Sequence, residues 1–508
     1  MSRLLRNTLL VMGGTLASRL LGQVRQTLLA NLPLSDSLKD AFWVAYRIPN
    51  LLRELLAEGA IQNALIPVLA QLSPEEARRF ARRFGAFLLG VNLVVLGLGL
   101  LFAREIAGAL LWLAEAALQQ ESPLRAPEVF EQLVLLVRLV LPFLLAISMA
   151  ALFSSVLQSS ERFGLSSFSP MAFNLGAIGL MLLFPNSVVA LGLSVTIGGL
   201  LQALVQLPGL RGYGLEFRWH PAFRTALARI GPFAFTTSVR QFLNLVLLSI
   251  LAAYPTAAVT GFQNGELLFT TALGLLAVSP AMAAFPRLSA LGGSPEARAL
   301  LDRLLTRLAV PLGFTSAMMV ALGPWAVGLI YAITPNFSEA NRAFTTETVQ
   351  ALGLALLPWG LNQLLLRGFY AAGQVGQAVR ITVGVALLNT LGYWLLRGEG
   401  LFVLNLATAA AGWAGLWAYA WRLERLGLLR ARALGATVLK ASLAALPAGL
   451  AAQGVASWLG APGQFLHNLL PLLGGGLVGL AVFVGLAWRM GLPLWRKHGE
   501  RNGETRVV

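Results

Sequence analysis

The chain has 508 residues, of which 57% are hydrophobic and only 12% are charged. Soluble domains carry about 25% charged residues, so this composition excludes an ordinary soluble fold and indicates a membrane protein. A formal net charge of +16 raises the question of nucleic acid, but no basic stripe interleaved with aromatic residues accompanies it. We therefore expect no nucleic-acid partner.

Cysteine is absent, and the three histidines are His220, His467 and His498. A chain without thiols has no disulfide framework and no thiolate chemistry, and so few histidines leave little for a metal site. We expect neither a metal nor a cofactor.

Apolar stretches of about 20 residues recur along the chain, and this is the length that a helix needs to span a bilayer. About fourteen such helices are predicted, which gives an all-α integral membrane fold. The predicted spans are 7–32, 38–72, 82–103, 129–158, 166–184, 188–208, 228–254, 257–286, 303–332, 347–373, 376–397, 399–421, 434–458 and 468–490.

The arginines alternate between successive connections. They gather before the first predicted helix and after even-numbered ones, as at 78–83, 211–229 and 422–432, whereas 185–187, 254–257 and 460–469 carry no Lys or Arg. Basic residues are retained on the cytoplasmic side of a membrane, so the alternation predicts a multi-pass protein with both termini in the cytoplasm.

Prolines recur at a nearly constant offset of 216 to 222 residues. The pairs are Pro33 and Pro255, Pro67 and Pro286, and Pro142 and Pro358. Six helices separate the copies, and an even number makes the two halves run parallel about an axis along the membrane normal. We predict two six-helix lobes related by a pseudo-two-fold axis, then helices 13 and 14 and a basic cytoplasmic tail, at 1–210, 211–425, 426–490 and 491–508.

Two arginines, Arg19 and Arg25, lie inside the first apolar segment. An ionised side chain near the bilayer centre costs roughly 2.5–3.5 kcal/mol on insertion scales, so charges at this depth indicate a water-filled cavity or an anionic ligand. The two residues are separated by about 120° around a helix, so both can border one wide cavity but cannot share a narrow face. The alternative is that each side chain snorkels toward the membrane surface.

The second predicted helix carries several charges on one helical stripe. They follow at intervals of seven, seven and four residues, at Asp40, Arg47, Glu54 and Glu58. Pro49 predicts a break in this helix, and broken helices at membrane depth are tolerated where they line a cavity. Arginine's planar fork suits phosphate oxygens, so arginines along such a cavity favour a phosphate or pyrophosphate ligand. The alternative is pairing of Arg47 or Arg53 with the nearby glutamates.

The segment Ser18–Arg25 (SRLLGQVR), followed by Asp40–Phe42 (DAF), Arg47–Arg53 (RIPNLLR) and Ala57–Ala60 (AEGA), resembles a known signature. It is similar to that of the MurJ/MviN lipid II flippases, a family of the multidrug/oligosaccharidyl-lipid/polysaccharide exporter superfamily. The resemblance is specific over about the first 70 residues. The rest of the chain matches more loosely, through the helix count and the two additional C-terminal helices.

The resemblance implies a flippase rather than an enzyme. Its cargo would be lipid II, the undecaprenyl-pyrophosphate-linked peptidoglycan precursor, carried from the inner to the outer leaflet of the bacterial cytoplasmic membrane by alternating access. The resemblance also implies a monomer in contact with membrane lipids, with a lipid-tail groove formed by helices 13 and 14. The implied substrate contacts are Ser18, Arg19, Arg25, Asn50 and Arg53, and the implied gating or cavity carboxylates are Asp40, Glu54 and Glu58.

Some positions depart from the family. Where members of the family carry a further arginine, this chain has Leu267. Where some members carry acidic residues that bind sodium, the nearest positions of this chain are Leu247 and Gln374. The second departure argues against sodium coupling. Two related functions stay open: a flippase for another lipid-linked oligosaccharide, which shares the anionic pyrophosphate, and a drug/cation antiporter, whose cavity would be acidic. An integral-membrane glycosyltransferase would need outward acidic metal ligands, and the glutamates at 115–131 have no Asp-x-Asp spacing.

Overall fold

The computed structural model describes residues 3–55, 65–66, 68–69, 71–160, 162–210, 214–228, 247 and 249–493. These residues form helices and connecting turns, and no strand occurs among them. Eleven of the described helices are long and apolar enough to cross a membrane. The predicted all-α membrane class is confirmed, while the count of fourteen spans includes segments outside the described residues.

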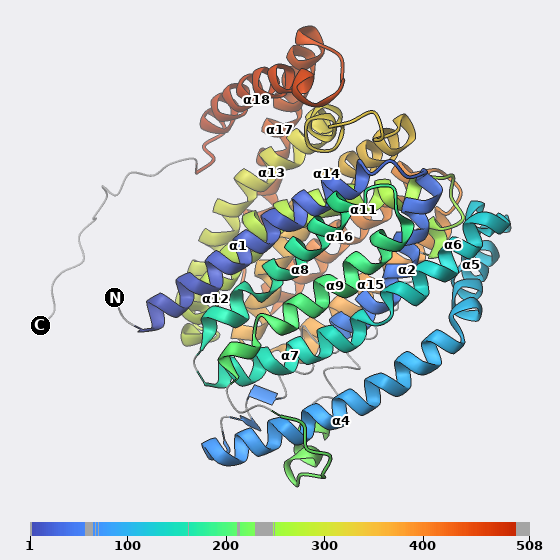
Figure 1. Ribbon diagram of the computed structural model, residues 1–508. Coiled ribbons are helices and arrows are strands. Elements are labelled where there is room, and N and C mark those ends of the chain that lie inside the picture. Colours follow the sequence, from blue (N-terminus) through green and yellow to red (C-terminus); the bar gives the residue numbers. More distant parts are fainter. Residues whose placement is uncertain are drawn as a thin grey trace, which may run out of the picture. The chain divides into compact units, whose positions relative to one another are not determined.

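The first compact unit comprises residues 1–264 and 334–341. Within it α1 packs on α8, α8 on α9, α2 on α6, and α4 on α7. Its helices, shown in Figure 1, are α1 (Arg3–Ala30), α2 (Asp36–Leu55), α4 (Pro74–Leu101), α5 (Ala103–Leu118), α6 (Pro127–Val140), α7 (Phe143–Ser159), α8 (Phe163–Leu183), α9 (Val188–Leu204) and the first part of α11 (Ala258–Leu273).

Two glycines let the helices of this unit approach closely. A Cβ on Gly14 in α1 would lie 2.3 Å from the carbonyl oxygen of Ser167 in α8, and one on Gly198 in α9 would lie 2.7 Å from that of Phe173. Any side chain at either position would push the helices apart, because packed interiors have no spare volume. α8 is therefore held tightly between α1 and α9, and this determines which face of α1 is covered.

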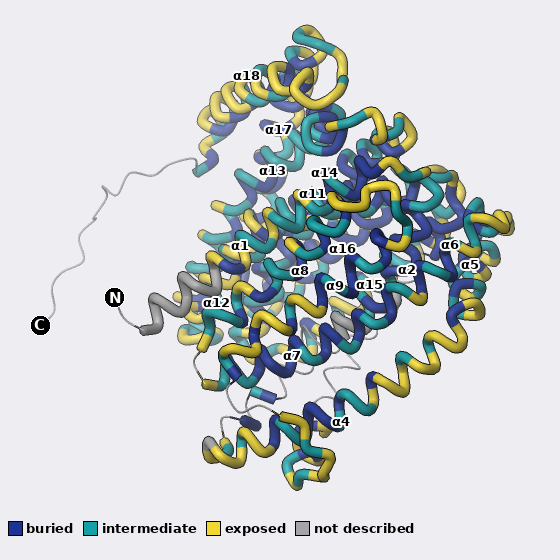
Figure 2. Tube along the Cα trace, viewed as in Figure 1, coloured by how far each residue is buried: buried dark blue, intermediate teal, exposed yellow. Residues whose placement is uncertain are grey.

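The second compact unit comprises residues 265–333 and 342–508. Here α13 packs on α17, α17 on α18, and α15 on α16. Its helices are α12 (Ser279–Leu291), α13 (Pro295–Tyr331), α14 (Glu339–Ala371, which begins in the first unit), α15 (Val375–Leu395), α16 (Leu401–Arg425), α17 (Ala431–Leu459) and α18 (Leu469–Arg489). Large apolar side chains stay exposed along α17 and α18, including Leu446, Leu450, Trp458, Leu470, Leu477 and Trp488 (Figure 2). The predicted pseudo-two-fold relation between lobes stays a prediction.

Three helical details differ from the predicted spans. Helix α5 was not predicted, because Arg104, Glu105 and Glu115 interrupt its apolar character. The span predicted at 129–158 consists of α6 and α7, which meet at Pro142, a residue that lacks a backbone N–H. The span predicted at 257–286 contains a π-helical turn, Gly274–Val278, between α11 and α12. Most of the span predicted at 228–254 lies outside the described residues.

The predicted break at Pro49 is wrong. Helix α2 runs without interruption from Asp36 to Leu55 and contains Pro49 in its interior. A proline removes the hydrogen bond of its own nitrogen, and its ring crowds the carbonyl four residues earlier. Because α2 packs against α6 and α7, tertiary contacts hold the helix through this position.

Candidate functional site

One face of α1 is covered by α8. Ser18 lies on this face, where the side-chain amide of Asn174 donates to the Ser18 carbonyl oxygen at 3.1 Å and to its Oγ at 3.4 Å. The same amide donates to the carbonyl oxygen of Pro170, one turn earlier in α8. Ser18, a predicted substrate contact, thus contributes to the packing of α1 on α8.

Arg25 lies two turns after Ser18 and therefore shares its face of α1. Its guanidinium carbon is 5.0 Å from the centroid of the Phe173 ring in α8. A cation over an aromatic face is stabilised by the ring quadrupole, so Phe173 orients the arginine as well as contacting it. Arg25 is half-buried in this position.

Arg19 occupies a different face of α1 and is exposed. Thr15, Gln23 and Gln26 lie at i−4, i+4 and i+7 from it, so the four side chains form one polar stripe along α1. The stripe ends in a buried contact, because Gln26 Nε2 donates at 2.8 Å to the Oδ1 of Asn264 in α11. The predicted angular separation thus places Arg19 on the exposed polar stripe and Arg25 against the Phe173 ring of α8.

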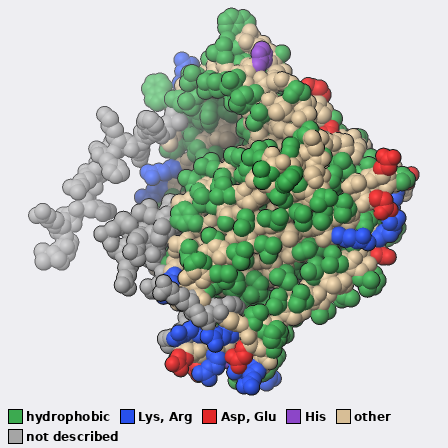
Figure 3. Space-filling view, viewed as in Figure 1, with side chains coloured by type: hydrophobic (Ala, Val, Ile, Leu, Met, Phe, Trp, Pro, Cys, Tyr) green, Lys and Arg blue, Asp and Glu red, His purple; other side chains and the backbone are tan. Residues whose placement is uncertain are grey.

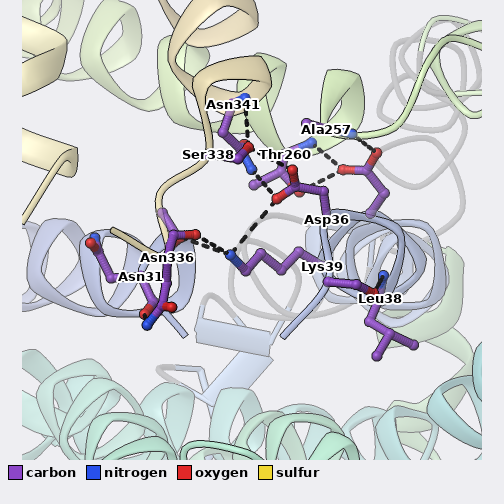
Figure 4. A network of polar contacts seen from close by, with 12 residues as sticks. Asn31, Asp36, Leu38, Lys39, Ala257, Thr260, Asn336, Ser338 and Asn341 are labelled. Carbon is purple, nitrogen blue, oxygen red and sulfur yellow. Dashed lines mark hydrogen bonds and ion pairs between the residues drawn. The ribbon is translucent and has the colours of Figure 1, made fainter. Parts of the chain in front are cut away.

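Asp40 of α2 is buried and binds the start of α11. Its Oδ2 accepts from the Ala257 N–H at 2.7 Å, and its Oδ1 accepts from the N–H and the Oγ1 of Thr260 at 2.8 and 2.6 Å. Figure 4 labels the two partners, Ala257 and Thr260. Ala257 has a φ of 79°, which an alanine adopts only under constraint. A carboxylate at a helix N-terminus satisfies free N–H groups and complements the helix dipole, so Asp40 holds this turn in place.

The turn before α11 is also held through its carbonyl groups. Gln120 Nε2 donates to the Ala253 carbonyl oxygen at 2.6 Å, and Ser122 Oγ donates to that of Ala252 at 2.5 Å. The segment after α5 therefore binds the carbonyl groups of this turn, and Asp40 binds the N–H groups that follow.

A buried lysine binds the segment between α13 and α14. Lys39 is fully buried, and its Nζ donates to the carbonyl oxygens of Ala30 at 3.1 Å and Asn336 at 2.9 Å. Its ion-pair partner is Asp36, at 3.8 Å. Asp36 in turn accepts from Ser338 Oγ at 2.5 Å and Asn341 Nδ2 at 2.6 Å, as Figure 4 shows.

Asn31 completes this network from the end of α1. Its Oδ1 accepts from the N–H of Thr334 at 2.8 Å and from its Oγ1 at 3.0 Å, while its own carbonyl accepts from Asn336 Nδ2 at 3.3 Å. We call Asn31, Asp36, Lys39 and Asp40, with the segments 257–260 and 334–341 that they bind, the polar clamp. Of these four residues only Asp40 was predicted as a site residue.

The remaining predicted residues lie in or after α2. Arg47 and Asn50 are half-buried in this helix. The side chains of Arg53, Glu54 and Glu58 lie outside the described residues, so their predicted roles and pairings stay predictions. Within the part of the chain that the structure describes, no three His, Asp or Glu side chains gather as metal ligands would.

The family model described as lipid II flippase MurJ matches residues 30–470 of the chain. The chain belongs to this family. A lipid II flippase MurJ from Burkholderia cenocepacia is 30% identical over 438 residues, which are 80% of this chain and 81% of that protein. The predicted family is thereby confirmed over most of the chain, and the range matched by the family model begins after Ser18, Arg19 and Arg25.

Solved structures show the same fold. A lipid II flippase MurJ in an inward closed conformation superposes with a TM-score of 0.77 at 21% identity, over 95% of this chain and 99% of that one. An inward-facing multidrug resistance transporter of the MATE family and MOP superfamily gives a TM-score of 0.62 at 12% identity, over 81% and 95% of the two chains. At these identities the likeness concerns the fold alone, and MurJ family members and MATE transporters share it.

Proposed function

We propose that this protein is a transporter that flips lipid II from the inner to the outer leaflet of the bacterial cytoplasmic membrane. The observation that carries the proposal is the family match over residues 30–470. The eleven described helices able to span a membrane fit a multi-pass carrier. The alternating arginine-rich connections support cytoplasmic termini. The protein works as a monomer, without catalytic chemistry.

The diphosphate of the headgroup binds at α1 in this proposal. Arg19 is exposed on a polar stripe, and Arg25 is oriented by Phe173, so two guanidinium groups on neighbouring faces of one helix reach a large anionic group. Asn50 and Arg53 of α2 extend the site, whereas Ser18 supports it by fixing α1 against α8. The exposed apolar side chains of α17 and α18 accommodate the long lipid tail.

The polar clamp acts as a gate. A headgroup held only by attraction would stay bound, so transport requires a second conformation in which some contacts are exchanged. Asp40 and the Asp36–Lys39 pair hold the segments 257–260 and 334–341 in the state described here. Opening breaks these bonds and frees Asp40, together with Glu54 and Glu58, to compete with the diphosphate for arginine.

A drug/cation antiporter is the weaker candidate, because such a carrier needs carboxylates free to attract a cation. The oxygens of Asp40 already accept three hydrogen bonds. A flippase for another lipid-linked oligosaccharide would use the same arginines, and the family match favours lipid II.

Complementation tests the proposed function. A bacterium depleted of its own lipid II flippase is expected to grow when this protein is expressed, and Arg19→Ala and Arg25→Ala are expected to abolish that growth. Membrane levels of each variant are measured by immunoblotting, so that loss of growth is attributed to function. Absence of rescue by the unaltered protein at normal membrane levels would contradict the proposal.

A further inference from the structure

A basic and aromatic surface in the first unit is not used by the proposed transport cycle. It is formed by residues 75–84, at the start of α4, and residues 214–228. Arg83 donates to Glu216 Oε1 at 2.7 Å and to the Trp219 carbonyl oxygen at 3.3 Å, and the Glu216 N–H donates to the Arg82 carbonyl oxygen at 3.3 Å. These bonds fix the two segments to each other. We call residues 75–84 and 214–228 together the α4 platform.

An aromatic cluster makes the platform rigid. The Phe223 ring is 1% exposed and packs against those of Phe80 and Phe84, with centroids 5.6 and 5.4 Å away. The rings of Trp219 and His220 close the cluster at 5.0 and 6.2 Å from Phe223. The surface is therefore preformed, and binding to it needs little ordering.

The outer side of the platform combines exposed apolar rings with arginines. Phe217 is 75% exposed and Trp219 63% exposed, and Arg79, Arg218 and Arg224 are exposed beside them. The two segments contain six arginines and three glutamates. Two of those glutamates are engaged, Glu76 with Ser73 and Glu216 with Arg83. The surface thus has a net positive charge, and Figure 3 shows basic side chains, with a few acidic ones among them, at the lower edge of the view.

The position of the platform along α4 indicates how deep it lies in the membrane. The first turns of α4 carry Arg78, Arg79, Arg82 and Arg83, and the apolar part of this candidate span follows Phe84. Charges cannot enter the hydrocarbon cheaply, so the platform lies where a span passes from headgroups to acyl chains. Aromatic side chains at this level anchor proteins to the interface, and arginines there attract anionic lipids.

We propose that the α4 platform is a docking surface for anionic phospholipid headgroups, with Phe217 and Trp219 inserted at the interface. Arg79, Arg218 and Arg224 bind the phosphates, while Arg83 keeps the segment 214–220 in place. Arg83 and Glu216 are 133 positions apart in the chain, so only the fold brings the two halves of the platform together.

The chain contains no cysteine, so a Phe217→Cys variant can be labelled at that position alone with a polarity-sensitive fluorophore. The fluorophore replaces an exposed ring, so the fold is not disturbed. The full-length labelled protein is placed in nanodiscs of phosphatidylcholine, or of phosphatidylcholine mixed with phosphatidylglycerol. Emission and quenching by an aqueous quencher are then measured. We expect a blue shift and protection from the quencher in the anionic nanodiscs, and much less of both in the neutral ones.

A charge-removal variant and a matched control complete the test. Arg79→Gln, Arg218→Gln and Arg224→Gln together should abolish the protection, because each basic side chain lost near an anionic surface weakens binding by about fivefold. Arg287→Gln, Arg303→Gln and Arg307→Gln remove the same charge from the second unit and should change nothing. Equal quenching in both kinds of nanodisc, protected or accessible, would overturn the proposal, as would full protection of the charge-removal variant. A fluorophore accessible in both would instead favour a protein partner.

Discussion

The ammonium group of Lys39 lies 2.9 Å from the carbonyl oxygen of Asn336, although the two residues are 297 positions apart in the chain. Lys39 is fully buried, so its charge is compensated by this carbonyl, by that of Ala30 and by Asp36. The contact joins the start of α2 to the segment between α13 and α14, and it places an ionised group at the centre of the polar clamp.

Lys39→Met is therefore expected to destabilise the protein. The substitution leaves the carbonyl groups of Ala30 and Asn336 without the Lys39 donor and removes the cation paired with Asp36, which should lower the free energy of unfolding by about 1–3 kcal/mol. Thermal unfolding of the detergent-solubilised protein measures this change. Lys440→Met is the control, since Lys440 donates to the Met490 carbonyl oxygen in an exposed position and should matter little. Equal effects of the two substitutions would contradict the structural role of Lys39.

Thr260→Val tests the contact between Asp40 and α11. It removes one of three hydrogen bonds to the carboxylate, so the free energy of unfolding should fall by about 1 kcal/mol, and Asp40→Ala should cost more because two N–H groups lose their acceptor. Thr270→Val is the control in the same helix, since Thr270 bonds only to carbonyl oxygens of its own helix. A cost for Thr270→Val as large as that for Thr260→Val would mean that the Asp40 contact contributes nothing.

Phe173→Leu is expected to reduce lipid II binding without unfolding the protein. Loss of the cation–π contact releases Arg25 from its orientation, and at about 0.5–1 kcal/mol this should weaken binding roughly two- to fivefold. Phe173→Tyr keeps an aromatic face and should bind normally, and Phe168→Leu in the same helix should have no effect. Binding is measured with purified lipid II, and identical affinities for Phe173→Leu and Phe173→Tyr would argue against the role of the ring.

Glu115 should make stability depend on pH in the acid range. The hydrogen bond from Arg125 holds the pKa of the Glu115 carboxyl below its usual value of 4.5. A lowered pKa means that the stabilisation is present above that usual value and is lost as the pH falls through the lower, folded-state value. Thermal unfolding across this range should show a smaller decline for Glu115→Gln. Glu131→Gln is the control, because the pair of Glu131 with Arg104 is 58% exposed on both sides. An unchanged decline in Glu115→Gln would exclude this contribution.

The spanning helices could be predicted because each is a continuous apolar stretch of the sequence, long enough to cross a bilayer. The spans at 303–332 and 399–421 correspond to α13 and α16, and the helical period correctly separated Arg19 from Arg25. The break expected at Pro49 was wrong because packing on α6 and α7 outweighs the lost hydrogen bond and the steric crowding at this proline.

The polar clamp could not be predicted, because its contacts join residues that only the tertiary fold brings together. Asp36 and Asn341, for example, are 305 positions apart. A signal was nevertheless present in composition. Lys39 is one of only three lysines in the chain, and it begins an apolar segment where a lysine is costly unless it is paired. Asn31 lies two residues before Pro33, one of the repeated prolines, and this proline also indicated a turn.

The most direct test of the account is the fraction of lipid II accessible from the outer face of flippase-depleted cells that express this protein or its Arg19→Ala variant. We predict that the unaltered protein restores outward lipid II and that Arg19→Ala does not. Leu20→Ala, at the neighbouring exposed position, should behave like the unaltered protein. Normal outward lipid II in cells whose Arg19→Ala protein reaches the membrane at normal levels would contradict the assignment of this guanidinium to the headgroup.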